Sequence, residues 1–309
     1  MFSVYRVVDG AAQSTEPLGT KYKFWFEHPD LGSTLFKEGR PNTGENWAEV
    51  IAAGLATHLQ LPHASYQLAT YEGRNGVITP SLVARGARVV HGNEVLAAVV
   101  TGYLVEQPQR YRNPNHTLRR VLAYLRASAD NVGAPYGAPK SPGVRTALDF
   151  FIGYLMFDAW IGNQDRHDQN WGILRMNDGN LFLSPSFDHG SSMARNEPDA
   201  KRKIRMTTKD MPFHISSFVC LARSGLFPSG GAEDESAIPL STVEAFQHAS
   251  QQSPVAAAEW RDRLACVRDA DVQTIIDMVP SDWMTSIARE FTFELLRLNK
   301  ARIISASNL

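Results

Sequence analysis

Polar side chains crowd into the short segment Gly162–Leu174, which directly follows a strongly apolar stretch. Asp165 and Asn170 stand five residues apart in this segment. A carboxylate at Asp165 can orient an attacking hydroxyl and accept its proton. The neutral amide oxygen of Asn170 can bind Mg2+ without adding negative charge beside phosphate groups. His167, between them, could contact a transferring phosphate or orient a neighbouring carboxylate by a hydrogen bond.

A second carboxylate follows at Asp188, eighteen residues after Asn170. The interval has room for a hairpin, with strands expected at Gly172–Leu174 and Leu181–Leu183 around a turn at Asn177–Gly179. Such a hairpin returns Asp188 toward the segment that holds Asp165. Two carboxylates and an amide meeting there would suit a metal ion that bridges a triphosphate.

The first eighty residues offer groups that could grip the phosphates. Lys37 ends an expected strand, and Glu49 lies twelve residues later on an expected helix, where it can pair with Lys37. An ordinary surface ion pair is the alternative interpretation. Upstream, Ser14–Lys21 contains hydroxyls, backbone N–H groups and a glycine that suit a loop covering phosphates.

The elements that must position these groups divide into two parts. Short strands are expected at Phe2–Val8, Tyr22–Phe26 and Thr34–Lys37 as an antiparallel meander, followed by one helix and two further strands. The remainder is expected to be mainly helical, with an apolar buried helix at Ala147–Ile161. We therefore expect an α+β chain with a small β-rich lobe over residues 1–82 and a larger helical lobe over residues 83–309.

The composition excludes several functional classes. A formal net charge of −1 gives no general electrostatic case for nucleic acid or an anionic membrane. The most apolar stretch is too short to span a bilayer, and no signal peptide is visible. Two distant cysteines give no disulfide framework and favour a cytoplasmic location. A local basic run between Arg195 and Lys209 could bind an acidic or phosphorylated substrate, or be a solvated loop.

These motifs resemble the HipA-like kinase family, whose fold is shared by protein kinases and phosphatidylinositol 3/4-kinases. The strongest parts are Asp165-Arg166-His167-x-x-Asn170, similar to the kinase catalytic loop, and Asp188-His189-Gly190-Ser191-Ser192. Weaker parts are Gly19-Thr20-Lys21 as the phosphate loop, Lys37 as the ATP-binding lysine, and Glu49 as its partner.

The resemblance implies Mg-ATP-dependent phosphorylation of Ser or Thr in a protein substrate, often by the toxin half of a toxin–antitoxin pair. It also implies autophosphorylation in the phosphate loop, with Ser14, Thr15 and Thr20 as the available hydroxyls, and a small DNA-binding antitoxin as partner. His189 stands where a D-F-G motif has Phe. The N-terminal subdomain of longer members is expected to be missing, because strands start at residue 2.

Three alternatives stay open at this point. The Asp165-Arg166-His167 loop also resembles phosphatidylinositol kinases, which would make the acceptor a lipid or small molecule. A nucleotide-binding regulatory pseudokinase would retain the fold with little turnover. Nucleotidyl transfer to protein would use the same kind of site with ATP bound in reverse.

Overall fold

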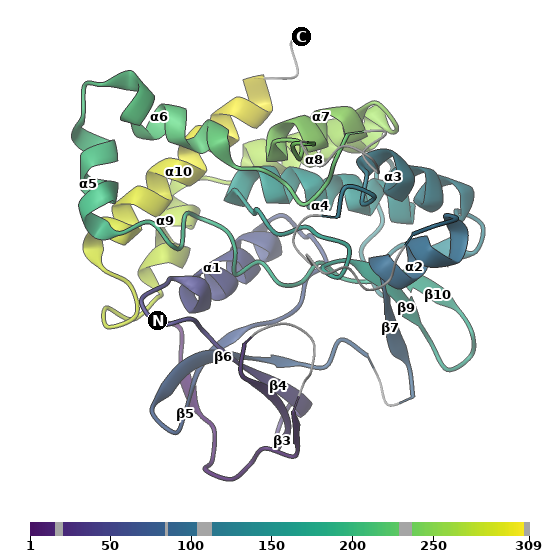
Figure 1. Ribbon diagram of the computed structural model, residues 1–309, viewed down its shortest axis with the longest axis horizontal. Coiled ribbons are helices and arrows are strands. Elements are labelled where there is room, and N and C mark those ends of the chain that lie inside the picture. The colour runs from purple at the N-terminus through teal and green to yellow at the C-terminus, as the bar shows by residue number, and fades with distance from the viewer. Residues whose placement is uncertain (16–20, 84–85, 104–112, 229–236, 306–309) are drawn as a thin grey trace.

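The computed structural model describes residues 1–15, 21–83, 86–103, 113–228 and 237–305. In these ranges the chain forms a smaller lobe built on a sheet and a larger lobe built mainly of helices (Figure 1). The polypeptide passes from the sheet into the helical part after residue 80, where the last strand of the first sheet ends.

The smaller lobe contains a six-stranded sheet in the order β1-β5-β6-β4-β3-β2. Its strands are β1 (Val4–Arg6), β2 (Ser14–Thr15), β3 (Lys23–His28), β4 (Gly32–Glu38), β5 (Gln67–Tyr71) and β6 (Arg74–Pro80). Alternate residues of β3 are buried, as expected for a strand with one covered face. Phe24 packs against Phe36 and Tyr71, with ring centroids 5.1 and 4.6 Å away. Because Phe36 is packed into this aromatic core, the next residue of β4, Lys37, lies on the opposite face of the sheet.

The expected antiparallel meander of the first three strands was wrong. β1 pairs with β5 in parallel, so that Val4 lies opposite Leu68, whereas β2, β3 and β4 are antiparallel neighbours. A parallel pair needs a long connection, and local patterns cannot reveal which distant strand supplies it.

Helix α1 (Glu45–His58) lies between the sheet and the helical lobe (Figure 1). Its apolar residues are buried on both sides, because β5 and β6 pack against it from one lobe and α9 from the other. Gly54 makes the close approach possible, since a Cβ there would lie 2.9 Å from Ile275 Cγ2. The helix therefore holds Glu45 and Glu49 where the two lobes meet.

The larger lobe contains a second sheet that the sequence did not reveal in full. β7 (Arg88–His91), β9 (Gly172–Arg175), β10 (Leu181–Leu183) and β8 (Val132–Gly133) lie side by side in that order. β9 and β10 form the expected antiparallel hairpin, in which Phe182 lies opposite Leu174. β7 extends the hairpin and leads directly into α2, so it joins the hairpin to the segment after the first sheet.

The second sheet lies at one edge of the helical lobe beside α2, and the other helices of the lobe are grouped around α4 (Figure 1). The helices of this lobe are α2 (Gly92–Val99), α3 (Leu118–Ala127), α4 (Ala147–Ile161), α5 (Asp199–Thr207), α6 (Ile215–Phe218), α7 (Thr242–Ser250), α8 (Pro254–Cys266), α9 (Asp269–Asp277) and α10 (Ser286–Ser305). Thr146 and Asp149 form a capping box at the start of α4, and Gly162 ends that helix in the left-handed conformation. As expected, α4 is buried along its whole length. In the described ranges no helix is both long and apolar enough to cross a membrane.

Candidate active site

The loop after α4 is held in place by a fully buried arginine. Arg166 donates to both carboxylate oxygens of Asp158, from Nε at 2.7 Å and from Nη2 at 2.8 Å. It also donates from Nη1 to the carbonyl of Asn170 at 2.7 Å and from Nη2 to Ser186 Oγ at 2.9 Å. Asn163 Nδ2 completes the partners of Asp158 at 2.8 Å. One side chain therefore joins α4, both ends of the loop and the segment that leads to Asp188.

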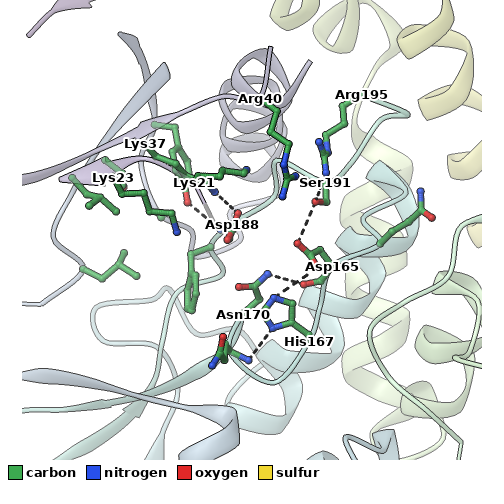
Figure 2. A pocket seen from close by; sticks show the side chains of 18 of the residues that line it. Lys21, Lys23, Lys37, Arg40, Asp165, His167, Asn170, Asp188, Ser191 and Arg195 are labelled. Atoms are coloured by element: carbon green, nitrogen blue, oxygen red, sulfur yellow. Dashed lines mark hydrogen bonds and ion pairs between the residues drawn. The ribbon is translucent and has the colours of Figure 1, made fainter. Parts of the chain in front are cut away.

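This anchoring sets the positions of Asp165 and Asn170. Asn170 Nδ2 donates to the backbone carbonyl of Asp165 at 2.7 Å, which turns its amide oxygen away from that carbonyl (Figure 2). Ser191 Oγ donates to Asp165 Oδ2 at 3.2 Å. His167 Nδ1 accepts from the backbone N–H of Gln169, and Nε2 of the same ring faces Asp165 Oδ1 at 3.7 Å. The loop thus presents one oriented carboxylate and one oriented amide oxygen.

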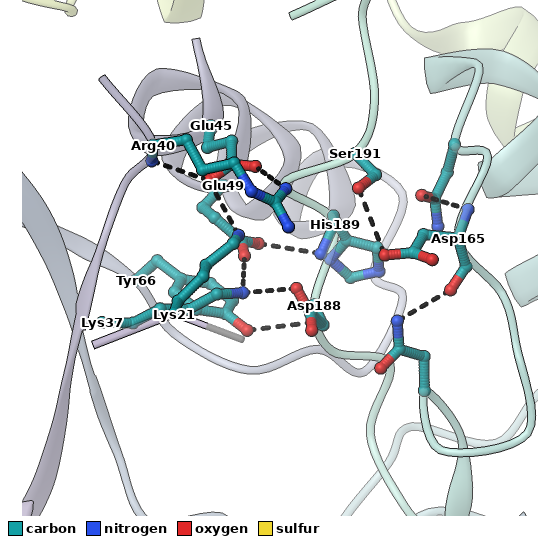
Figure 3. A network of polar contacts seen from close by, with 12 residues as sticks. Lys21, Lys37, Arg40, Glu45, Glu49, Tyr66, Asp165, Asp188, His189 and Ser191 are labelled. Carbon is teal, nitrogen blue, oxygen red and sulfur yellow. Dashed lines mark hydrogen bonds and ion pairs between the residues drawn. The ribbon is translucent and has the colours of Figure 1, made fainter. Parts of the chain in front are cut away.

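Asp188 lies opposite, at the junction of the lobes (Figure 3). Lys37 Nζ contacts Asp188 Oδ1 and lies 3.0 Å from Glu49 Oε1. The backbone N–H of Asp188 donates to Tyr66 Oη at 3.0 Å, and that of His189 donates to Glu49 Oε2 at 2.8 Å. Glu49 therefore binds the lysine of one lobe and the backbone of the other at the same time.

The backbone around Asp188 is shaped to allow these contacts. Asp188 adopts a positive φ of 57°, a conformation that costs energy for a residue with a side chain and is often found at functional sites. A Cβ on Gly190 would lie 3.0 Å from Glu49 Oε1, so glycine leaves room for that carboxylate. Behind them, His189 Nε2 lies 2.7 Å from Ser186 Oγ in a fully buried position. Burial and the neighbouring Arg166 hold the pKa of His189 well below its usual range, so the ring is neutral.

The electrostatics of the site keep its key groups charged. Burial alone lowers the pKa of Lys37, but the carboxylates of Asp188 and Glu49 outweigh this effect and raise that pKa well above its usual range. Burial alone raises the pKa of Asp188, but Lys37, Lys21 and Lys23 hold it far below the usual value. Burial raises the pKa of Asp165, although His167 opposes the shift. Asp165 is therefore a stronger base than an exposed aspartate.

Apart from Glu49, which lies behind Lys37, these groups line one cavity of about 760 Å³. Its polar wall contains Lys37, Asp165, Asn170 and Asp188 (Figure 2). The other walls include apolar side chains from the sheet and from the segment that joins the lobes, namely Leu35, Ala64, Pro80, Leu82, Val83, Val89 and Phe187. The structure thus brings together the residues that the sequence analysis placed in separate lobes.

The expected phosphate loop is only partly described. Lys21 lines the cavity, and its Nζ lies 2.8 Å from Glu45 Oε2. Ser14 and Thr15 form the exposed edge strand β2, which pairs with β3. Gly19 and Thr20 lie outside the described residues.

Several residues of the cavity escaped the sequence analysis. Arg40 lines the cavity and Glu45 contacts it, and their closeness to Glu49 in the sequence was the only signal for them, whereas Arg195 had been noted only as part of a basic run and Ser191 only as part of the Asp188 motif. Asp168, in the same polar segment as Asp165 and Asn170, would be expected from its charge to be solvated or in an ion pair. Instead it is buried and accepts hydrogen bonds from Tyr103 Oη and, at 3.0 Å, from Asn113 Nδ2.

Comparison with solved structures identifies the fold. The kinase CtkA of Helicobacter pylori superposes with a TM-score of 0.72 and 17% sequence identity, over 96% of this chain and 92% of the other. HipA of Shewanella oneidensis MR-1, solved with HipB and operator DNA, gives a TM-score of 0.56 and 12% identity, over 96% of this chain and 66% of that chain. The chain has a HipA-like kinase fold. The expected bilobal α+β class is confirmed with it.

This chain adopts the HipA-like kinase fold although its sequence is only 17% identical to CtkA and 12% identical to HipA. No family model matches the chain, and no curated protein matches it either. The resemblance stated from two short motifs therefore pointed to the correct fold where whole-chain sequence comparison did not. In this fold the motif residues Asp165, Asn170 and Asp188 lie at the cavity between the lobes.

Proposed function

We propose that this chain is an ATP-dependent kinase that transfers a phosphoryl group from Mg-ATP to a Ser or Thr hydroxyl of a protein. The observation that carries the proposal is the position of Lys37. It is buried between the carboxylates of Glu49 and Asp188, in a cavity whose facing wall presents Asp165 and Asn170. A lysine, two metal-binding oxygens and a base in one cavity are the parts that phosphoryl transfer from ATP requires.

The cavity fits Mg-ATP in size and in chemistry. About 760 Å³ is within the range of cofactor sites. The apolar wall of Leu35, Val83 and Val89 suits the adenine base. Asp188 uses Oδ1 for Lys37, which leaves Oδ2 for a metal, and Asn170 adds an amide oxygen. Hard oxygen donors of this kind suit Mg2+, which neutralises the charge of bound phosphates.

The protein's own residues then have distinct roles. Lys37 remains charged and holds phosphate oxygens. Asp165, which Ser191 orients, accepts the proton of the acceptor hydroxyl, and His167 fixes the direction of that carboxylate. Residues 1–82 act as the nucleotide-binding lobe and residues 83–309 as the acceptor-binding lobe. Ser14, Thr15 and Thr20 remain the proposed autophosphorylation sites.

A DNA-binding antitoxin is the partner that the fold suggests. The HipA structure contains HipB and operator DNA, and this chain is similar to HipA over most of its own length. We propose a small DNA-binding protein as the corresponding partner here and a cytoplasmic location for the complex. Co-purification of such a protein, encoded next to this chain, would support the assignment; a purified chain that binds no such neighbour would refute it.

Turnover of ATP by an Asp188→Asn variant tests the kinase proposal. The amide removes the charge that binds metal and Lys37, so we expect the rate to fall by at least about 100-fold, as with other losses of electrostatic stabilisation. Asp178→Asn is the matched control, since Asp178 is exposed in the β9–β10 turn and bonds only Asn180 among the described contacts. Equal turnover in the Asp188→Asn variant and the wild type would refute the proposed site.

A further inference from the structure

One wall of the cavity concentrates positive charge around a single carboxylate. The side chain of Glu45 is only 3% exposed, yet it contacts three cations. Lys21 Nζ and Arg40 Nη1 each lie 2.8 Å from it, and Arg195 contacts Oε1 as well. Glu45 is a carboxylate that all three cations share, so positive charge is concentrated at this wall; Figure 3 shows Lys21 and Arg40 beside Glu45.

All three cations line the same cavity as the catalytic candidates. Burial lowers the pKa of Lys21 and the neighbouring Lys37 adds to this shift, although Asp188 and Glu45 oppose it. A further anion at this wall would relieve the repulsion among the cations. It would also gain charge-assisted hydrogen bonds, which are about twice as strong as neutral ones.

This wall reaches the side of the cavity where the hydroxyl that receives the phosphoryl group would bind. Arg195 Nη2 donates to Ser191 Oγ at 3.1 Å, and Ser191 donates in turn to Asp165. In Figure 2, Arg40 and Arg195 lie beyond Asp188 on the side of Ser191, whereas Lys23 and Lys37 lie on the other side of Asp188. Ligand atoms that reach Arg195 are therefore close to the group that would receive the proton of the acceptor hydroxyl.

The cations are fixed in place by the backbone as well as by Glu45. The N–H of Gly44 donates to the carbonyl of Arg195 at 2.9 Å. The N–H of Arg40 donates to Glu45 Oε2 at 3.0 Å. Two guanidinium groups held in this way need little reorganisation to bind an anion.

The positive surface continues along the chain from Arg195. Helix α5 is attached to this segment because Arg202 Nη2 donates to the carbonyl of Ala194 at 3.2 Å. Lys201 and Lys203 are exposed on α5, and neither is in an ion pair among the described residues. An extended acidic ligand would thus meet further positive charge outside the cavity.

We propose that Lys21, Arg40 and Arg195 form a subsite for an acidic side chain, a carboxylate or a phosphate, next to the acceptor Ser or Thr of a peptide substrate. This inference rests on the proposed kinase function and adds its substrate class. Glu45 holds the three cations together until the acidic group binds. The rival ligand for the same cations is the terminal phosphate of ATP, which has the same chemistry.

The test compares matched acceptor peptides with the full-length chain and Mg-ATP. A Ser/Thr peptide library with glutamate, phosphoserine or glutamine around the acceptor is phosphorylated by the wild type and by Arg40→Gln and Arg195→Gln variants. We expect the wild type to prefer acidic over glutamine peptides by about tenfold or more in kcat/KM, the effect of a hydrogen bond to a charged group. Each variant should lose most of this preference. Arg74→Gln is the control, since Arg74 is as exposed as Arg40 and pairs with Glu38 outside the cavity.

Each outcome supports or refutes the proposed subsite, and the outcomes separate its failure from failure of the proposed kinase function. Equal rates for acidic and glutamine peptides in the wild type would refute the subsite and leave the kinase intact. A raised KM for ATP in the two variants, with the acidic preference unchanged, would assign the cations to the nucleotide and also refute the subsite. No transfer to any peptide, with ATP still consumed, would refute a peptide acceptor and the subsite together. No consumption of ATP at all would refute the proposed function itself.

Discussion

Replacing Arg166 by alanine should destabilise the whole chain and disorganise the catalytic loop. Arg166 is fully buried and donates hydrogen bonds to Asp158, Asn170 and Ser186. Its removal leaves the carboxylate of Asp158 buried, with the amide of Asn163 as the one remaining hydrogen-bond donor among the described residues. An unpaired buried charge is among the few changes that destabilise a protein severely.

The expected magnitude follows from these contacts. Breaking a buried ion pair by removing one partner costs about 3–5 kcal/mol. The lost bonds to the carbonyl of Asn170 and to Ser186 Oγ would each add about 1.5–3 kcal/mol, since they involve a charged donor. Proteins are stable by only about 5–15 kcal/mol in total, so the variant should be close to unfolding at room temperature.

Urea unfolding followed by tryptophan fluorescence measures the effect, because Trp160 and Trp171 are buried beside the loop. Two comparisons make the result specific. Arg268→Ala, which breaks an exposed ion pair with Asp271, should leave the free energy of unfolding nearly unchanged. Replacing Arg166 by Met together with Asp158 by Leu should recover much of the lost stability, since no charge then remains buried. A loss below about 1 kcal/mol in the Arg166→Ala variant would refute the reasoning.

Two further predictions concern pH. His116 donates from Nδ1 to the carbonyl of Gly225 and accepts at Nε2 from Trp171 Nε1, and burial lowers its pKa from 6.5 to about 4. The unfolded chain therefore binds a proton between pH 6.5 and 4 that the folded chain does not, so stability should fall by up to about 3 kcal/mol as the pH drops through this window. His116→Gln should flatten this part of a plot of unfolding free energy against pH; an unchanged slope would contradict the assignment. Activity should also be lost on acidification, because Asp165 must be ionised and its pKa is raised. Ser191→Ala removes a hydrogen bond to that carboxylate and should move the acidic limb of the kcat/KM profile to higher pH, whereas a shift to lower pH would contradict it.

The catalytic loop could be predicted because its signals are local. The apolar helix before it, the hairpin after it and the spacing of Asp165 and Asn170 are all properties of one continuous segment. The hairpin returns the chain beside the loop, which is why Asp188 could be assigned to the same site. The ion pair between Lys37 and Glu49 follows in the same way from a strand and the next helix.

Features that depend on distant segments could not be predicted. The parallel pairing of β1 with β5, and β7 as a neighbour of β9, join segments far apart in the chain. Asp168 lies in a polar segment of the sequence, but the side chains of Tyr103 and Asn113, far from it in the chain, hydrogen-bond to its carboxylate. The group around Glu45 has the same origin, because Arg195 reaches it from the other lobe. Such contacts are decided by the packing of the lobes, on which a local pattern carries no information.

The mass of the product formed from ATP and magnesium tests the central claim most directly. If Lys37, Asp165, Asn170 and Asp188 form one phosphoryl-transfer site, mass spectrometry should find phosphate added to a Ser or Thr of the chain or of an acceptor peptide. The same product should be absent with the Asp188→Asn variant and present with the Asp178→Asn control. Addition of adenylate, or phosphate added equally by the Asp188→Asn variant, would contradict the claim.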